Sequence, residues 1–216
     1  MTTRLAAAAL VEQLAKDGFA VAPGYFAPSL CSALAAEAFA LANDPAAINA
    51  GVGRGDGHAN APEIRRARIR WIDGTTAPQA HFLAEAESLR RVLNETLFLS
   101  LTTFEAQLAL TPTGGFYQRH LDSFRGRRNR IVSLVGYLNA GWQPADGGSL
   151  RVWPPADPAD NSAALPFDII PASGTLVLMR SEDVAHEVLP NHRPRASIAG
   201  WFRVHDGDHP GVPGRH

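Results

Sequence analysis

The chain has 216 residues, of which 45% are hydrophobic, and a formal net charge of −1 at pH 7. These values exclude intrinsic disorder and a broadly basic nucleic-acid-binding surface, and they allow one domain with a sizeable core. The single cysteine, Cys31, cannot form an internal disulfide and indicates a reducing, cytoplasmic environment. No apolar stretch is long enough to cross a membrane, so we expect no membrane partner. We expect one domain over residues 1–216 that is a monomer or weak dimer and has no nucleic-acid partner.

The first 100 residues are expected to be mainly helical. An Ala/Leu-rich segment up to Lys16 predicts an amphipathic helix, residues 19–22 a short strand, and residues 29–43 a second helix. Glycine then occupies every second position from Gly51 to Gly57, without the preceding strand and the following GK[ST] of a phosphate-binding loop. We interpret it as a surface loop of unassigned role. Residues 78–100 have apolar side chains at helical spacing and predict a third helix.

Residues 64–72 alternate in character, which predicts a strand. Three arginines share one face, and the opposite face carries Arg65, Ala67, Ile69 and Trp71. Arg65 is the charged member of this otherwise apolar face. A charge there needs an acidic or backbone partner, so Arg65 is either a structural anchor or part of a site.

From residue 104 onward, short strand-like segments are separated by Pro, Gly and Asp turns. Helices first and strands afterwards indicate an α+β chain whose sheets close into a sandwich or barrel. We therefore divide the domain into a helical part, about 1–100, and a β core, about 104–204. The predicted strands are 104–110, 115–122, 130–138, 149–153, 165–170, 174–179, 184–189 and 195–203.

Two histidines and an aspartate form a candidate metal site. His120 and Asp122 are two residues apart at the end of a strand-like segment, so both side chains project from one face. Of the eight histidines in the chain, His186 stands between two valines on a predicted strand. Two imidazoles and one carboxylate are the set that holds non-haem Fe(II). The same set binds catalytic zinc, although the usual H-E-x-x-H helix is absent.

Strand alternation places further polar residues on inward faces. Tyr137 shares a face with Ser133, and Arg195 shares a face with Ser197 and Trp201. Arg195 follows His186 by nine residues and offers a permanently charged, forked donor suited to a carboxylate. The combination suggests an oxygenase that uses iron and a dicarboxylate co-substrate.

Several segments together resemble a known family. They are residues 128–142 (RNRIVSLVGYLNAGW), 147–154 (GGSLRVWP), 186–190 (HEVLP) and 195–202 (RASIAGWF). With the segment from Ile64, they resemble the Fe(II)- and 2-oxoglutarate-dependent prolyl hydroxylases of the hypoxia-inducible-factor and bacterial elongation-factor-Tu branch. The likeness extends from about residue 60 to residue 203.

The resemblance implies a double-stranded β-helix, or jelly-roll, core with the N-terminal helices packed on one sheet. It implies hydroxylation of a C–H bond, most plausibly of a prolyl residue in a protein, with Fe(II), 2-oxoglutarate and dioxygen, and with ascorbate as a candidate reductant. The implied iron ligands are His120, Asp122 and His186. The implied 2-oxoglutarate site contains Arg195, Tyr137, Leu150 and Ser197, and the implied substrate side contains Arg65, Trp71 and Trp201.

Two alternatives stay open. The same centre could act on a free amino acid or another small metabolite, with arginines 119, 125, 127, 128 and 130 steering an acidic substrate. The scaffold could also serve as a non-catalytic sensing or binding module. The chain departs from the family pattern where a tyrosine is common before the first ligand, near Thr111, and at Ala67 and Ala199, which stand where the family can carry an aspartate and a threonine.

Overall fold

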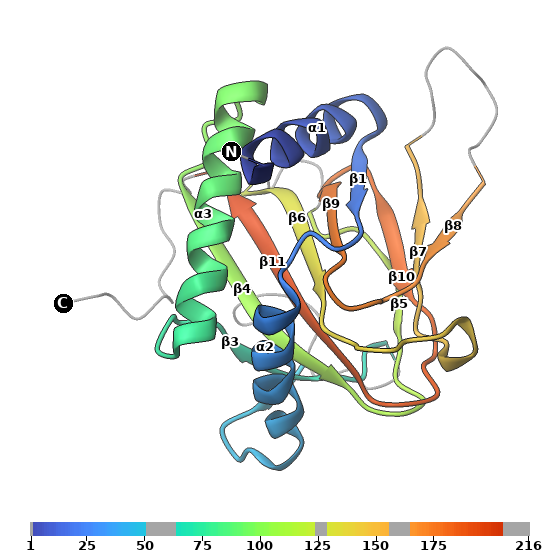
Figure 1. Cartoon of the computed structure of the whole chain (residues 1–216). Coiled ribbons are helices and arrows are strands. Elements are labelled where there is room, and N and C mark those ends of the chain that lie inside the picture. Colours follow the sequence, from blue (N-terminus) through green and yellow to red (C-terminus); the bar gives the residue numbers. More distant parts are fainter. Residues whose placement is uncertain (1, 51–63, 124–128, 156–164, 205–216) are drawn as a thin grey trace.

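The computed structural model describes residues 2–50, 64–123, 129–155 and 165–204. Its helices α1 (Thr2–Asp17), α2 (Pro28–Ala40) and α3 (Ala77–Leu97) gather on one side of a β core (Figure 1). A short 3-10 helix, η1 (Leu41–Asn43), continues α2, and a second, η3 (Pro144–Asp146), precedes β7. The predicted helices at 29–43 and before Lys16 are therefore confirmed.

The β core consists of two antiparallel sheets, which is the predicted double-stranded β-helix. The smaller sheet contains, in spatial order, β5 (Tyr117–His120), β10 (Ala185–Val188), β7 (Leu150–Trp153) and β8 (Phe167–Ile169). The larger sheet contains β1 (Phe19–Ala22), β9 (Leu176–Arg180), β6 (Arg130–Tyr137), β11 (Arg195–Arg203), β4 (Thr103–Thr111), β3 (Arg68–Trp71) and β2 (Ile48–Asn49).

The third helix is shorter at its end than predicted. The helix expected to reach about residue 100 ends at Leu97. Phe98 and Ser100 have positive φ angles, and residues with positive φ cannot be part of a right-handed helix. At its start, the Thr76 hydroxyl accepts a hydrogen bond from the Gln79 amide, as an N-cap does.

The strand predicted over 64–72 changes partner along its length. Only β3 belongs to the larger sheet, where it pairs with β4. Before it, the Arg66 amide donates to the Phe116 carbonyl (3.0 Å) and Arg65 forms a bridge with Tyr117 next to the smaller sheet. This segment therefore passes from one sheet to the other, which places Arg65 beside β5.

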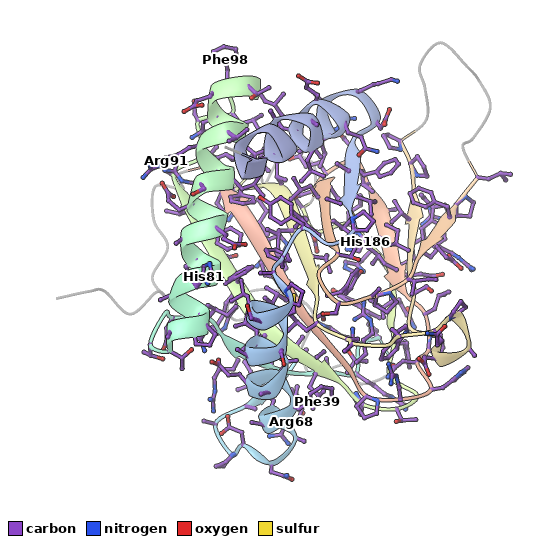
Figure 2. All side chains as sticks on the ribbon, viewed as in Figure 1. Phe39, Arg68, His81, Arg91, Phe98 and His186 are labelled. Atoms are coloured by element: carbon purple, nitrogen blue, oxygen red, sulfur yellow. The ribbon has the colours of Figure 1, made fainter. Side chains whose placement is uncertain are left out.

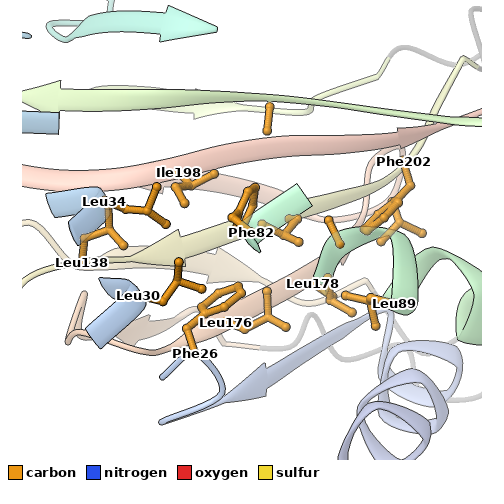
Figure 3. Packing of buried hydrophobic residues seen from close by; sticks show 14 of the residues in the cluster. Phe26, Leu30, Leu34, Phe82, Leu89, Leu138, Leu176, Leu178, Ile198 and Phe202 are labelled. Carbon is orange, nitrogen blue, oxygen red and sulfur yellow. The ribbon is translucent and has the colours of Figure 1, made fainter. Parts of the chain in front are cut away.

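Apolar side chains fill two layers. The larger layer lies between the helices and one face of the larger sheet, where Phe26, Leu30, Leu34, Phe82 and Leu89 meet strand residues such as Leu178 and Ile198 (Figure 3). The smaller layer lies between the sheets and includes Tyr137, Leu150, Val152, Val177 and Met179. The N-terminal helices thus pack on one sheet as expected and leave the space between the sheets for a site.

None of the helices that the structure describes has the length and apolar character needed to span a membrane.

Candidate metal centre

The strand pairing of the smaller sheet brings the three predicted metal ligands together. His120 ends β5, Asp122 follows two residues later, and His186 on β10 pairs directly with His120. Their ligand atoms all lie within 4.8 Å of one another. Asp122 Oδ1 is 3.6 Å from His120 Nε2, and Asp122 Oδ2 is 3.7 Å from His186 Nε2. His186 lies within the β core, whereas His81 lies on α3 (Figure 2).

Both histidines present the same ring nitrogen to this centre. The Nδ1 atom of His120 lies 2.7 Å from the carbonyl oxygen of Gln118, and that of His186 lies 3.1 Å from the carbonyl oxygen of Val184. A carbonyl can only accept, so Nδ1 carries the proton and Nε2 keeps its lone pair. Burial also lowers the pKa of His186, despite the opposing charge of Asp122. A neutral imidazole is the form that binds a metal.

Asp122 supplies the negative charge of the centre. Burial opposes its ionisation, but His186, His120 and the Ser133 hydroxyl outweigh burial and hold the pKa of Asp122 well below its usual range. The resulting donor set of two imidazole nitrogens and a carboxylate fits Fe(II) and leaves coordination positions for other ligands.

A cavity of about 930 Å³ adjoins the three ligands and extends between the sheets. Arg195, only 3% exposed, lines its inner part, and its guanidinium carbon lies 5.0 Å from the ring centre of Tyr137. Arg195 Nε and Tyr137 Oη are buried without a hydrogen-bond partner among the described residues. Buried donors without partners are costly, and a carboxylate between them would satisfy both.

The protonation of this pair suits an anion. Burial raises the pKa of the Tyr137 phenol, which therefore keeps its proton and can donate. Burial lowers the pKa of Arg195, partly offset by Tyr137, and a guanidinium starts so high that it remains charged at neutral pH. The far carboxylate of 2-oxoglutarate matches these two donors.

The other residues predicted for the co-substrate lie at the same place. Leu150 and Ser197 line the cavity, and the Ser197 hydroxyl lies 3.5 Å from Arg195 Nη1. Thr111, at the position near which the family commonly has a tyrosine, faces Arg195 across the β4–β11 pair and lines the cavity as well.

The three residues predicted for the substrate side, Arg65, Trp71 and Trp201, also line the cavity. Trp71 is 46% exposed and its ring lies 6.4 Å from that of the buried Trp201. Arg65 places its guanidinium 4.8 Å from the ring centre of Tyr117, which is a cation–π contact. Burial lowers the pKa of Arg65, and Tyr117 and the negative charge of Asp122 oppose this effect.

Sequence reasoning missed two contacts of the ligands. The Tyr117 ring stacks on the His120 ring, with centroids 3.6 Å apart and an interplanar angle of 20°. Ser133 donates a hydrogen bond of 2.6 Å to Asp122 Oδ2. Strand phase placed Ser133 on an inward face, but which partner it meets there depends on the distance between the sheets.

The arginines proposed to steer an acidic metabolite have protein partners where they are described. Arg119 stacks on Trp153 at 4.1 Å, and Arg130 stacks on Trp201 at 3.6 Å and pairs with Glu105 at 2.8 Å. Arginines 125, 127 and 128 and the loop from Gly51 to Gly57 lie outside the described residues.

Known proteins match both the sequence and this geometry. Residues 106–203 match the model of the 2OG-Fe(II) oxygenase superfamily. A prolyl-4-hydroxylase from Pseudomonas putida is 40% identical, with a TM-score of 0.82 over 91% of this chain and 98% of that chain.

Two solved structures with lower sequence identity are also similar to this chain. A prolyl hydroxylase from Trichoplax adhaerens, solved in complex with a hypoxia inducible factor oxygen degradation domain peptide fragment, is 25% identical, with a TM-score of 0.79 over 94% of this chain and 90% of that chain. A prolyl 4-hydroxylase from Phytophthora capsici shares the fold at 21% identity, with a TM-score of 0.71 over 94% of this chain and 64% of that chain. The chain therefore belongs to the 2OG-Fe(II) oxygenase superfamily, as a prolyl-hydroxylase-like enzyme that uses Fe(II), 2-oxoglutarate and dioxygen.

Proposed function

We propose that the enzyme hydroxylates a prolyl residue of a protein or peptide, with Fe(II) held by His120, Asp122 and His186. The observation that carries the proposal is the convergence of these three ligands within 4.8 Å beside a cavity that also holds Arg195. The 40% identity with a prolyl-4-hydroxylase supports the prolyl substrate. Decay into a binding module is disfavoured because the ligand set is complete.

In this proposal, Arg195 and Tyr137 bind the far carboxylate of 2-oxoglutarate through the two donors that otherwise lack partners. A guanidinium–carboxylate pair in a buried pocket is directional enough to orient the co-substrate. Leu150 provides an apolar wall that helps to exclude water. Bound iron, with 2-oxoglutarate and dioxygen, supplies the oxidation that turns a substrate C–H bond into C–OH while 2-oxoglutarate becomes succinate and carbon dioxide.

The residues that line the cavity on the predicted substrate side support a proline-containing segment as the substrate. Trp71 is 46% exposed and presents aromatic surface to the cavity beside the buried Trp201, and an aromatic face packs well against a pyrrolidine ring. Ala67 and Ala199 line the same region with small side chains, which leaves room for a peptide backbone. Arg65 adds hydrogen-bond donors that can reach a substrate carbonyl.

The first test removes the ligands. His120→Ala and Asp122→Ala should abolish succinate release and hydroxylation, because each removes one of three metal ligands. His81→Ala is the matched control, since this histidine is exposed on α3 and pairs only with Glu85 among the described residues. Succinate release that persists in both ligand variants would contradict the assignment.

The second test concerns the substrate. A proteome digest incubated with enzyme, Fe(II), 2-oxoglutarate and ascorbate should gain single oxygen atoms on prolyl residues, read by mass spectrometry. The same incubation with His120→Ala gives the background. Oxygen on a different residue type, or turnover of free metabolites alone, would contradict the prolyl proposal while leaving the iron chemistry in place.

A further inference from the structure

The metal-binding carboxylate is held from the opposite sheet. Ser133 on β6 of the larger sheet donates from Oγ to Asp122 Oδ2 at 2.6 Å. The Ser181 hydroxyl lies 2.8 Å from the Ser133 hydroxyl. Because a carboxylate can only accept, the Ser133 proton points to Asp122, and Ser133 Oγ is left to accept the proton of Ser181. The hydroxyls thus form a chain with one direction, from Ser181 through Ser133 to Asp122.

Both serines are almost fully buried, with 1% of Ser133 and 2% of Ser181 exposed. Ser133 stands on the inward face of β6, paired with Met179 on one side and Trp201 on the other. A buried hydroxyl without a hydrogen bond destabilises a protein. The chain to Asp122 gives both hydroxyls a hydrogen-bond partner.

The backbone of Ser181 strengthens this arrangement. Ser181 lies directly after β9, five residues before His186. Its carbonyl accepts from the amide of Ser123 at 3.1 Å, and its amide donates to the carbonyl of Ile131 at 3.0 Å. Ser181 is therefore joined by its backbone to the neighbour of Asp122 and to β6, and it lies on the connection that leads to the second histidine.

We propose that Ser181 and Ser133 are positioning residues that orient Asp122. The Ser133 hydroxyl holds Asp122 Oδ2, and Asp122 Oδ1 is thereby presented to the metal. The proposal rests on the proposed function, since it takes Asp122 as a ligand. The bond of 2.6 Å has the length of a strong O–H···O⁻ hydrogen bond. It competes with binding of Oδ2 to the metal.

This orientation matters because of the number of ligands. An Fe(II) ion held by two histidines and one carboxylate oxygen would keep coordination positions open for 2-oxoglutarate and dioxygen. A carboxylate that bound through both oxygens would occupy one of these positions. A hydroxyl bonded to Oδ2 would keep that position open.

The test measures metal binding directly, without turnover. Mn(II) is titrated into the metal-free full-length protein and followed by electron paramagnetic resonance. Ser133→Ala should weaken Mn(II) binding by about 10- to 100-fold, the usual range for partners of metal ligands. Ser133→Thr keeps the hydroxyl and should restore most of the affinity. Ser181→Ala should have a smaller effect, because Ser133 can still donate to Asp122.

The double variant tests whether the two hydroxyls act in series. If Ser181 acts through Ser133, Ser133→Ala with Ser181→Ala should bind Mn(II) no more weakly than Ser133→Ala alone. In addition, the visible charge-transfer band of the anaerobic complex with Fe(II) and 2-oxoglutarate should shift in Ser133→Ala, because the carboxylate geometry changes. A purely structural role would leave that band in place.

Thr175→Val is the control, since Thr175 is a buried hydroxyl residue just before β9 and lies outside the metal site. Equal loss of affinity in this control, wild-type affinity in Ser133→Ala, or additive effects in the double variant would each overturn the proposal. If Ser133→Ala does not fold, Ser181→Ala carries the test, and wild-type Mn(II) affinity in Ser181→Ala would then overturn the proposal. Failure of the wild-type protein to bind either metal would instead contradict the proposed function.

Discussion

Arg195 and Tyr137 together present two buried donors to one end of the cavity. A hydrogen bond to a charged group contributes about 1.5–3 kcal/mol. A ligand that meets both donors therefore gains much of its affinity there. The residues lie on neighbouring strands, β11 and β6, so their spacing is set by the sheet and not by a loop.

Tyr137→Phe should raise the KM for 2-oxoglutarate by roughly tenfold or more, because each 1.4 kcal/mol corresponds to a factor of ten. Arg195→Lys should raise it further, since an ammonium cannot reproduce the forked geometry. Initial rates of succinate release against 2-oxoglutarate concentration provide the measurement.

Arg193→Lys is the control, because Arg193 lies outside this end of the cavity, stacked on Trp142. A KM unchanged by both Tyr137→Phe and Arg195→Lys would mean that the co-substrate binds elsewhere.

At the scale of single residues, strand phase predicted which side chains face inward. His120, Asp122 and His186 could be chosen because residue type and alternation agree. Tyr117 could not be chosen, because its stacking on His120 requires two rings three residues apart in β5 to turn toward each other. The Ser133–Asp122 bond likewise joins residues on different sheets.

Among the connecting elements, the turn before β7 is built close to the co-substrate site. Gly148 has a φ of +67°, and a Cβ atom there would lie 2.9 Å from the Asn191 Cβ and 3.1 Å from the Arg195 Cδ. Glycine is therefore needed both for the backbone conformation and for the space beside Arg195. The turn supports the stem of the guanidinium that is proposed to bind 2-oxoglutarate.

Gly148→Ala should destabilise the protein and also raise the KM for 2-oxoglutarate, because the new methyl group displaces Arg195. Gly141→Ala separates the two effects, since Gly141 also has a positive φ, +60°, but has nothing within 4 Å of its Cβ position.

Gly141→Ala should therefore lower the thermal midpoint alone. Thermal unfolding and steady-state kinetics on both variants give the comparison. A normal KM in Gly148→Ala would show that Arg195 does not depend on this turn.

Element boundaries were predicted well where turn residues flank a strand, as for β6 and β11. The segment around Arg65 was predicted less well. Its alternation is that of a strand throughout, but Arg65 pairs beside β5 and residues 68–71 pair with β4. A sequence pattern indicates which face of a strand is apolar. It does not indicate which other strand pairs with that strand.

For the whole molecule, we propose that helices and β core unfold as one cooperative unit, because one hydrophobic layer joins them. Phe82 on α3 is fully buried, and its ring lies 5.8 Å from that of Phe26 and 6.1 Å from that of Phe104. Helix and sheet therefore share side chains that neither could bury alone.

Phe82→Ala should lower the free energy of unfolding by about 3–5 kcal/mol, since it leaves a cavity in this layer. Phe98→Ala is the control, because Phe98 is 84% exposed (Figure 2), and exposed positions usually change stability by about 0.5 kcal/mol or less.

Urea unfolding followed by far-ultraviolet circular dichroism and by tryptophan fluorescence should give coincident transitions. Two separate transitions would contradict a single unit.

The sequence by itself determined the α+β class, the identity of the candidate ligands and the inward faces of the main strands, because these follow from residue type and a period of two. Only the tertiary structure decided how those faces meet. It placed Arg195 Nε and Tyr137 Oη together, both without a hydrogen-bond partner among the described residues, stacked Tyr117 on His120, and joined Asp122 to Ser133 and Ser181 across the two sheets. The pattern within one strand specifies the face of the sheet to which each side chain points. The distances between side chains on different strands depend on how the whole core packs. The carboxylate of the candidate iron site, Asp122, is thus held by serines that lie 11 and 59 positions further along the chain.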